Sequence, residues 1–139
     1  MSISNPYSQY VDNQVLTASP GKILIMAYDA AIRFSKLAIQ KMKEGNLYEQ
    51  NRYIDKTQNI ILELISTLNP EANPNLAADL ESLYVYMYDH LTQANINDDV
   101  KMLEDIVTML SDLRASWAEA ELAVRRDGEN AHLLGVPSL

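Results

Sequence analysis

The chain has 139 residues, a formal net charge of −8 at pH 7 and no cysteine, which indicates one domain and is consistent with a reducing cytoplasm. This acidity argues against a nucleic-acid partner, because phosphate neutralisation needs clustered lysine and arginine. The lack of cysteine excludes disulfides and thiolate metal sites, and no apolar run approaches the ~18 residues of a membrane-spanning helix.

Residues 1–16 have neither the basic start nor the apolar stretch of a secretory signal. They are too few for an independent helix. Their apolar residues include Tyr7, Tyr10, Val11, Val15 and Leu16. We therefore expect this N-terminal cap segment to lie on the rest of the protein. We also hypothesise that it partly covers an apolar groove and moves when a partner binds.

A first helix is predicted to begin at Pro20, because Ser19 is a typical N-cap residue and proline is favoured at the first helical position. It runs to about Lys43 and ends at Gly45, since glycine is favoured just after a helix.

This first helix has no clean polar face. Between Ile23 and Ile32 the only charged residue is Asp29, whereas a surface helix normally shows one apolar stripe and one polar face. We expect Asp29 to be satisfied either by Arg33, four residues further on, or by a neighbouring helix.

A second helix is predicted from about Asn46 to Leu68, where apolar residues recur at helical spacing. The stretch Asn69 to Asn75 contains two prolines and three asparagines, which indicates a loop. Within it, Asn73 is expected to cap a third helix that begins at Pro74. The apolar stripe of this third helix is Leu76, Leu80, Leu83, Met87, Leu91 and Ala94.

Asn97 is predicted to cap a fourth helix, with Asp98 and Asp99 in the first turn, where the helix dipole favours anions. The apolar spacing fades after Arg126, and we expect residues 127–139 to form a flexible tail. Four helices with short connections predict an all-α, antiparallel up-down four-helix bundle of residues 17–126.

No catalytic or metal-binding pattern is found. A carboxylate-bridged metal pair needs two Glu-x-x-His motifs, and the only match is Glu129 with His132 in the tail. His90 is the candidate for a phosphotransfer bundle, but no basic residue follows it. We expect an ordinary surface histidine, no enzyme activity, no cofactor and no metal.

The remaining signal is apolar surface. The first and third helices are both apolar on more than one side, and they cannot bury every face against two neighbours. We therefore expect an exposed groove that binds an amphipathic partner helix. Tyr84, Tyr86 and Tyr88 on the third helix are of a type enriched at binding surfaces.

These features resemble the flagellar secretion chaperone family, bacterial proteins that bind flagellin before export. The similarity extends from about Tyr10 to Trp117. Its motifs are Tyr10 nine residues before Ser19, ASP followed by YDAAIRF, LYVYMYDHLTQAN, and LEDIVTMLSDLRASWAEA. Two departures are Ala30, where the family usually has glycine, and Gly21-Lys22, where a polar or acidic pair is common.

The resemblance implies a four-helix bundle of the bacterial cytosol with a short N-terminal capping segment. It implies binding to the C-terminal segment of flagellin, which prevents premature polymerisation and aids delivery to the gate of the flagellar type III export apparatus. The alternative is a regulatory adaptor for another amphipathic partner. We expect a monomer or weak homodimer. The implied contacts are Tyr10, Val15, Ala18, Ser19, Pro20, Ile23, Leu24, Leu80, Leu83, Tyr84, Met87, Leu91, Ala94 and Asn95.

Overall fold

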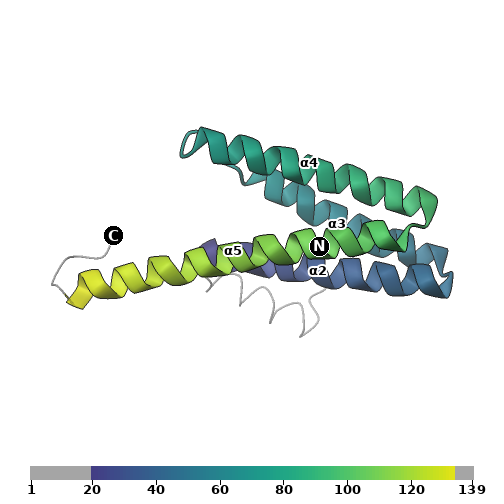
Figure 1. Ribbon diagram of the computed structural model, residues 1–139, viewed down its shortest axis with the longest axis horizontal. Coiled ribbons are helices and arrows are strands. Elements are labelled where there is room, and N and C mark those ends of the chain that lie inside the picture. Colours follow the sequence, from purple (N-terminus) through teal and green to yellow (C-terminus); the bar gives the residue numbers. More distant parts are fainter. Residues whose placement is uncertain (1–19, 134–139) are drawn as a thin grey trace, which may run out of the picture.

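The computed structural model describes residues 20–133, with side chains up to Asp127, and this range contains four helices and no strand. The helices are α2 (Pro20–Glu44), α3 (Leu47–Ser66), α4 (Pro74–Asn97) and α5 (Val100–Leu133). α2 packs against α3 and α5, and α4 packs against the same two helices, in an up-down bundle (Figure 1). The predicted all-α bundle is confirmed. The predictions for residues 1–19 and 134–139 lie outside the described residues.

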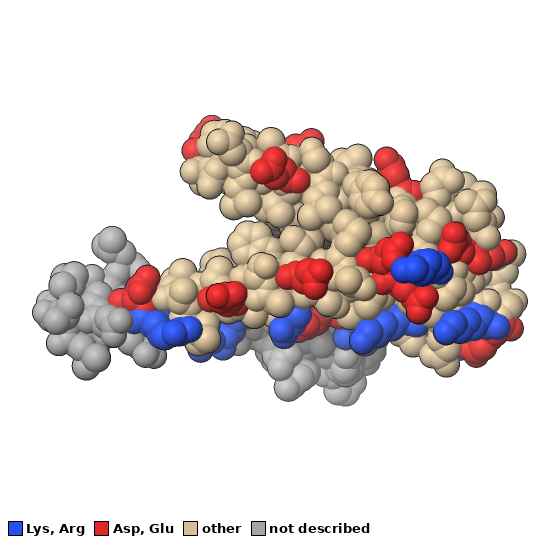
Figure 2. All heavy atoms as spheres, viewed as in Figure 1, with Lys and Arg blue, Asp and Glu red and all other residues tan. Residues whose placement is uncertain are grey.

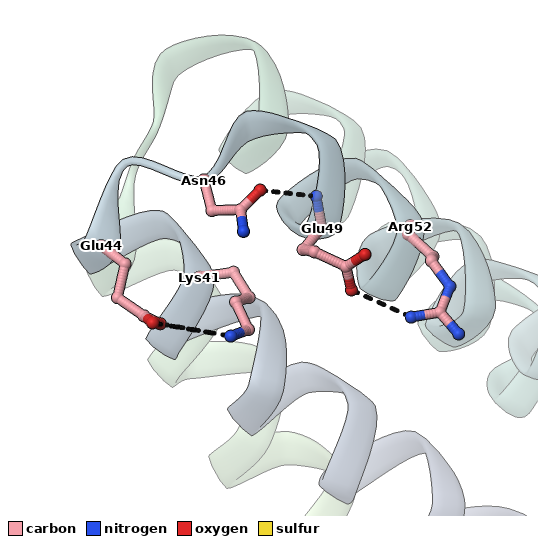
Figure 3. Close-up of polar contacts among 5 residues, drawn as sticks. All are labelled: Lys41, Glu44, Asn46, Glu49 and Arg52. Carbon is pink, nitrogen blue, oxygen red and sulfur yellow. Dashed lines mark hydrogen bonds and ion pairs between the residues drawn. The ribbon is translucent and has the colours of Figure 1, made fainter.

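The turn between α2 and α3 forms as its sequence predicts. Gly45 has φ of 72°, a left-handed conformation that glycine adopts without steric cost. Asn46 then caps α3, because its Oδ1 accepts a hydrogen bond from the backbone N–H of Glu49 at 3.2 Å (Figure 3). Two ion pairs flank the turn, Lys41–Glu44 and Glu49–Arg52 (Figure 3).

The start of α4 also agrees with the prediction, whereas the start of α5 does not. Asn73 caps α4, and Pro74 is its first residue. Asn97, however, belongs to α4, and the residue that caps α5 is Asp99, whose Oδ1 accepts from the N–H of Met102 at 3.1 Å. The predicted Asn97 cap is therefore wrong. The reason is that α4 continues through Asn97 and Asp98 takes the left-handed conformation that ends it, with φ of 50°, so the cap of α5 lies two residues later than expected. Asp98 and Asp99 therefore precede the first turn of α5, and the prediction that they lie within it is wrong.

α5 continues past Arg126 to Leu133, beyond the point at which its apolar spacing fades. This spacing records where a helix packs, not where it ends. In Figure 1 the last turns of α5 project beyond the ends of the other helices. Toward this end of α5, Leu122 and Val124 are exposed, at 48% and 68%.

The core contains one buried stripe from each helix. The α2 stripe contains the small, fully buried side chains of Ala31, Ser35 and Ala38. Their small size permits close approach of the neighbouring helices. Ser35 Oγ and Thr57 Oγ1 of α3 are hydrogen-bonded at 3.5 Å, so these buried hydroxyls are satisfied. The large fully buried side chains are Tyr28, Ile54, Ile61, Tyr84, Met87, Leu91, Leu103, Ile106 and Leu110.

Candidate partner-binding cleft

An open cleft lies beside the first half of α4, and its walls also include the connection from α3 to α4, Leu24 of α2 and Trp117 of α5. α4 and α5 are the least closely packed of the neighbouring pairs, and they diverge toward the start of α4 (Figure 1). Figure 2 shows the hollow between them. The cleft has a volume of about 200 Å³, and its lining residues are Leu24, Thr67, Leu68, Asn69, Ala72, Asn73, Leu76, Ala77, Leu80, Tyr84 and Trp117.

The connection between α3 and α4 forms one end of the cleft. It is the longest connection in the described range, extending from Thr67 to Asn73. Asn69 and Asn73 satisfy backbone N–H groups through their side chains, at Glu71 and Leu76 respectively, so the loop is held by its own turn chemistry. The adjacent first turn of α4 carries Leu76, which is 45% exposed.

Two lining residues of the cleft, Tyr84 and Trp117, belong to a hydrogen-bonded group of three aromatic residues from three helices. Tyr28 of α2 and Tyr84 of α4 are almost fully buried, and their Oη atoms are 2.5 Å apart. Trp117 of α5 donates its Nε1–H to Tyr28 Oη at 3.2 Å. Burial raises the pKa of both tyrosines, and the hydrogen bond to Tyr28 raises the pKa of Tyr84 further.

No lining residue of the cleft carries a charge, and most are aliphatic or aromatic. Such a surface binds by burial of apolar side chains, with the loop asparagines and Thr67 supplying polar groups at one end. It contains no combination of nucleophile, base and acid that would support catalysis. The lining of the cleft is therefore suited to apolar contacts and not to catalysis.

The structure brings some of the predicted contact residues to this cleft. Leu24, Leu80 and Tyr84 line it. Ile23 is 38% exposed, and Pro20 is exposed at the first residue of α2. Tyr10, Val15, Ala18 and Ser19 lie outside the described residues.

The predicted contact residues in the second half of α4 do not line the cleft. Met87, Leu91 and Ala94, which were predicted to contact the partner, are fully buried in the core and line no part of the cleft. Leu83 is half-buried and packs on the core, and Asn95 Oδ1 accepts from Gln50 Nε2 at 2.9 Å. The physical reason is that an i, i+3, i+4, i+7 stripe is what a bundle core requires, and spacing does not distinguish a core stripe from a partner stripe.

Sequence reasoning missed several lining residues, above all Trp117 and Leu76. In the sequence, Leu76 belongs to the apolar stripe of the third helix and Trp117 marks the end of the family similarity, so neither stands out as a binding residue. An apolar residue in the first turn of a helix that follows a long loop was the available signal. The outward divergence of α4 from α5, which opens the cleft, depends on tertiary packing that no local pattern encodes.

Two other candidate residues have structural roles. Asp29 pairs with a neighbouring helix, one of the two expected outcomes, because Arg114 of α5 donates Nε–H to its Oδ1 at 2.6 Å. His90 is half-buried and stacks on Tyr86, with ring centroids 5.1 Å apart. Among the described residues, no cluster of three or more His, Asp or Glu side chains is placed to hold a metal ion. No helix in this part of the chain is long and apolar enough to cross a membrane.

This chain is similar to flagellar proteins both in sequence and in fold. The family model described as "Flagellar protein FliS" matches residues 3–124. The flagellar secretion chaperone FliS of Bacillus subtilis is 39% identical over 127 residues, which cover 91% of this chain and 94% of the relative. The corresponding protein of Vibrio cholerae is 33% identical over 107 residues, covering 77% and 79% of the two chains. A crystal structure described as a bacterial flagellar chaperone superposes with a TM-score of 0.71 at 23% identity, covering 85% of this chain and 99% of that one.

Proposed function

Because the chain belongs to the family of the flagellar protein FliS, we propose that its client is the C-terminal segment of flagellin and that it binds this client in the bacterial cytosol. The family consists of flagellar secretion chaperones, not enzymes. In this proposal the protein keeps flagellin from polymerising too early and aids its delivery to the flagellar type III export apparatus.

The observation that supports this proposal is the uncharged, open cleft beside the first half of α4. An amphipathic client helix laid along it would bury its apolar face against Leu76, Leu80 and Trp117 in the helix-in-groove mode. Full burial of one large apolar side chain contributes roughly 1.5–3 kcal/mol. A client face covered in this way is no longer available to pair with other subunits.

The proposal is tested by two substitutions on α4 that differ only in whether they reach the cleft. Leu76 and Val85 are each 45% exposed, and only Leu76 lines the cleft. Leu76→Asp places a carboxylate where the client's apolar face must lie, which is costly when that carboxylate has no partner. We expect Leu76→Asp to weaken binding of a flagellin C-terminal peptide by at least about tenfold, equivalent to about 1.4 kcal/mol.

Val85→Asp is the matched control and should leave the affinity within about twofold of wild type. Isothermal titration calorimetry gives the affinities, and thermal melts establish that both variants are folded. Equal affinity of Leu76→Asp and wild type would place the client elsewhere. Failure of the wild-type protein to bind flagellin, with capture of another amphipathic helix, would favour the regulatory adaptor instead.

A further inference from the structure

A second groove lies on the outward-facing side of α2 and shares no lining residue with the cleft. It has a volume of about 350 Å³. Ile32 and Leu37 are half-buried and provide its apolar part, while Arg33, Lys36 and Gln40 provide its polar part. Asp29 lies at one end. This groove is lined by apolar and cationic side chains, whereas the cleft is lined only by uncharged residues.

The charge of α2 is opposite to that of the chain as a whole. α2 has five basic residues and two acidic ones, whereas the chain carries a net charge of −8. α4 has three acidic residues and no basic residue. Figure 2 shows Lys and Arg gathered along the edge of the molecule where α2 and α5 lie. The protein therefore repels an acidic partner over much of its surface and attracts it along this edge.

Within the described part of the chain, no carboxylate forms an ion pair with either cation of the groove. The sequence allows Asp29 to pair with Arg33, but Arg114 takes Asp29 instead. Arg33 then rests over the Phe34 ring, 4.9 Å from its centroid. Neither Arg33 nor Lys36 forms an ion pair with any residue that the structure describes.

A third cation, on the neighbouring helix, lies near the same aromatic ring as Arg33. Lys56 of α3 also lies over the Phe34 ring, with Nζ 5.4 Å from the centroid. It too forms no ion pair within the described part of the chain. Arg33 and Lys56 are thus held near the same ring, which stacks on Tyr53.

We propose that this outward face of α2 docks an acidic, amphipathic helix of a second protein. Its carboxylates would pair with Arg33 and Lys36, and its apolar residues would cover Ile32 and Leu37. Acidic residues three or four positions apart on the incoming helix match the three-residue separation of the two cations. Charge complementarity of this kind selects the partner and its orientation more than it adds affinity.

The probe for this proposal is a fluorescently labelled synthetic peptide of about 18 residues, or about five helical turns, with leucine on one face and glutamate on the other. Binding to the full chain is followed by fluorescence anisotropy. We expect saturable binding that the double variant Arg33→Glu/Lys36→Glu weakens by at least about tenfold. NMR chemical shifts should change at residues 32–40 and not along the cleft.

The control double variant is Lys101→Glu/Arg126→Glu, which changes the net charge by the same amount on exposed positions of α5. It should retain the wild-type affinity within about twofold. Equal weakening by both double variants would reduce the effect to overall charge and overturn the proposal. So would equal binding of a peptide with the same composition in scrambled order.

Two further outcomes would assign the face to a different occupant and also overturn the proposal. One is peptide binding that appears only after residues 1–19 are removed, which would make the chain's own N-terminal segment the occupant. The other is a dimer of the wild-type protein, seen by light scattering, that Arg33→Glu/Lys36→Glu dissociates. Circular dichroism of each variant verifies that the helices are intact.

Discussion

The hydroxyl groups of Tyr28 and Tyr84 illustrate how single atoms organise this bundle. The two residues come from α2 and α4, which do not otherwise pack closely. Each hydroxyl would be costly to bury alone, and their mutual hydrogen bond offsets that cost. Trp117 adds a second donor to Tyr28 from α5. The position of α4 beside the cleft therefore depends in part on one buried polar contact.

Removing one of these hydroxyls should destabilise the fold measurably. Tyr84→Phe keeps the ring and deletes the bond to Tyr28, so we expect the free energy of unfolding to fall by about 1 kcal/mol. Tyr86→Phe, at a position that is 52% exposed, is the control and should change it by less than about 0.5 kcal/mol. Urea denaturation measures both. An unchanged midpoint for Tyr84→Phe would mean that the bond contributes nothing to stability.

The same pair makes stability sensitive to alkaline pH. Burial raises the pKa of both hydroxyls above the ordinary value of 10.0, so above this pH the unfolded chain loses these protons before the folded protein does. Stability is thus fully present below about pH 10 and is lost as pH rises through the raised values. We expect urea midpoints to fall between about pH 9 and about pH 11, and to fall less in Tyr28→Phe/Tyr84→Phe. Equal slopes for the two proteins would contradict this assignment.

At the scale of elements, α4 has two unlike halves. Its second half is tied to α3 by side-chain hydrogen bonds. Gln50 Nε2 donates to Asn95, and Gln58 Nε2 donates to Thr92 Oγ1 and to the carbonyl of Tyr88. Its first half borders the open cleft and exposes Leu76. The helix is therefore anchored at one end and less supported at the other.

This asymmetry predicts unequal protection of backbone amides in α4. We expect amide hydrogens near Leu80 to exchange faster than those near Leu91, because opening the first half breaks fewer tertiary contacts. Hydrogen exchange followed by NMR measures both sets in one sample. A bound flagellin peptide should slow exchange in the first half selectively. Uniform protection along α4 would show that the helix opens only as one unit.

Local sequence signals account well for the helix boundaries and poorly for the cleft. Gly45 and the Asn73–Pro74 pair mark turns through their own conformational preferences, so their positions agree with prediction. The cap of α5 is Asp99, whereas the prediction was Asn97. Several adjacent residues here can each cap a helix, so the sequence alone does not determine which one does. The core position of Met87 and the cleft position of Trp117 depend on how the helices diverge. That divergence arises from contacts distant in sequence.

At the scale of the whole molecule, two surfaces of opposite chemistry share one bundle. The cleft beside α4 has an uncharged lining, and the outward face of α2 carries cations that the described carboxylates leave unpaired. Their separation is a consequence of the packing order, since α2 and α4 each contact α3 and α5. Because the two surfaces share no lining residue, a substitution in one can be examined without altering the other.

Salt should distinguish these two surfaces in a single protein. Mobile ions screen exposed charges over about 10 Å at 0.1 M ionic strength but hardly affect apolar burial. Between about 50 and about 300 mM NaCl, we expect the affinity for the flagellin C-terminal peptide to change by less than about twofold and that for the acidic probe to fall by more than about fivefold. Calorimetry and anisotropy on the same preparation supply both values. A steep salt dependence for flagellin would mean that charged residues outside the cleft contribute much of its binding. A flat response for the acidic probe would leave Arg33 and Lys36 without a role in recognition.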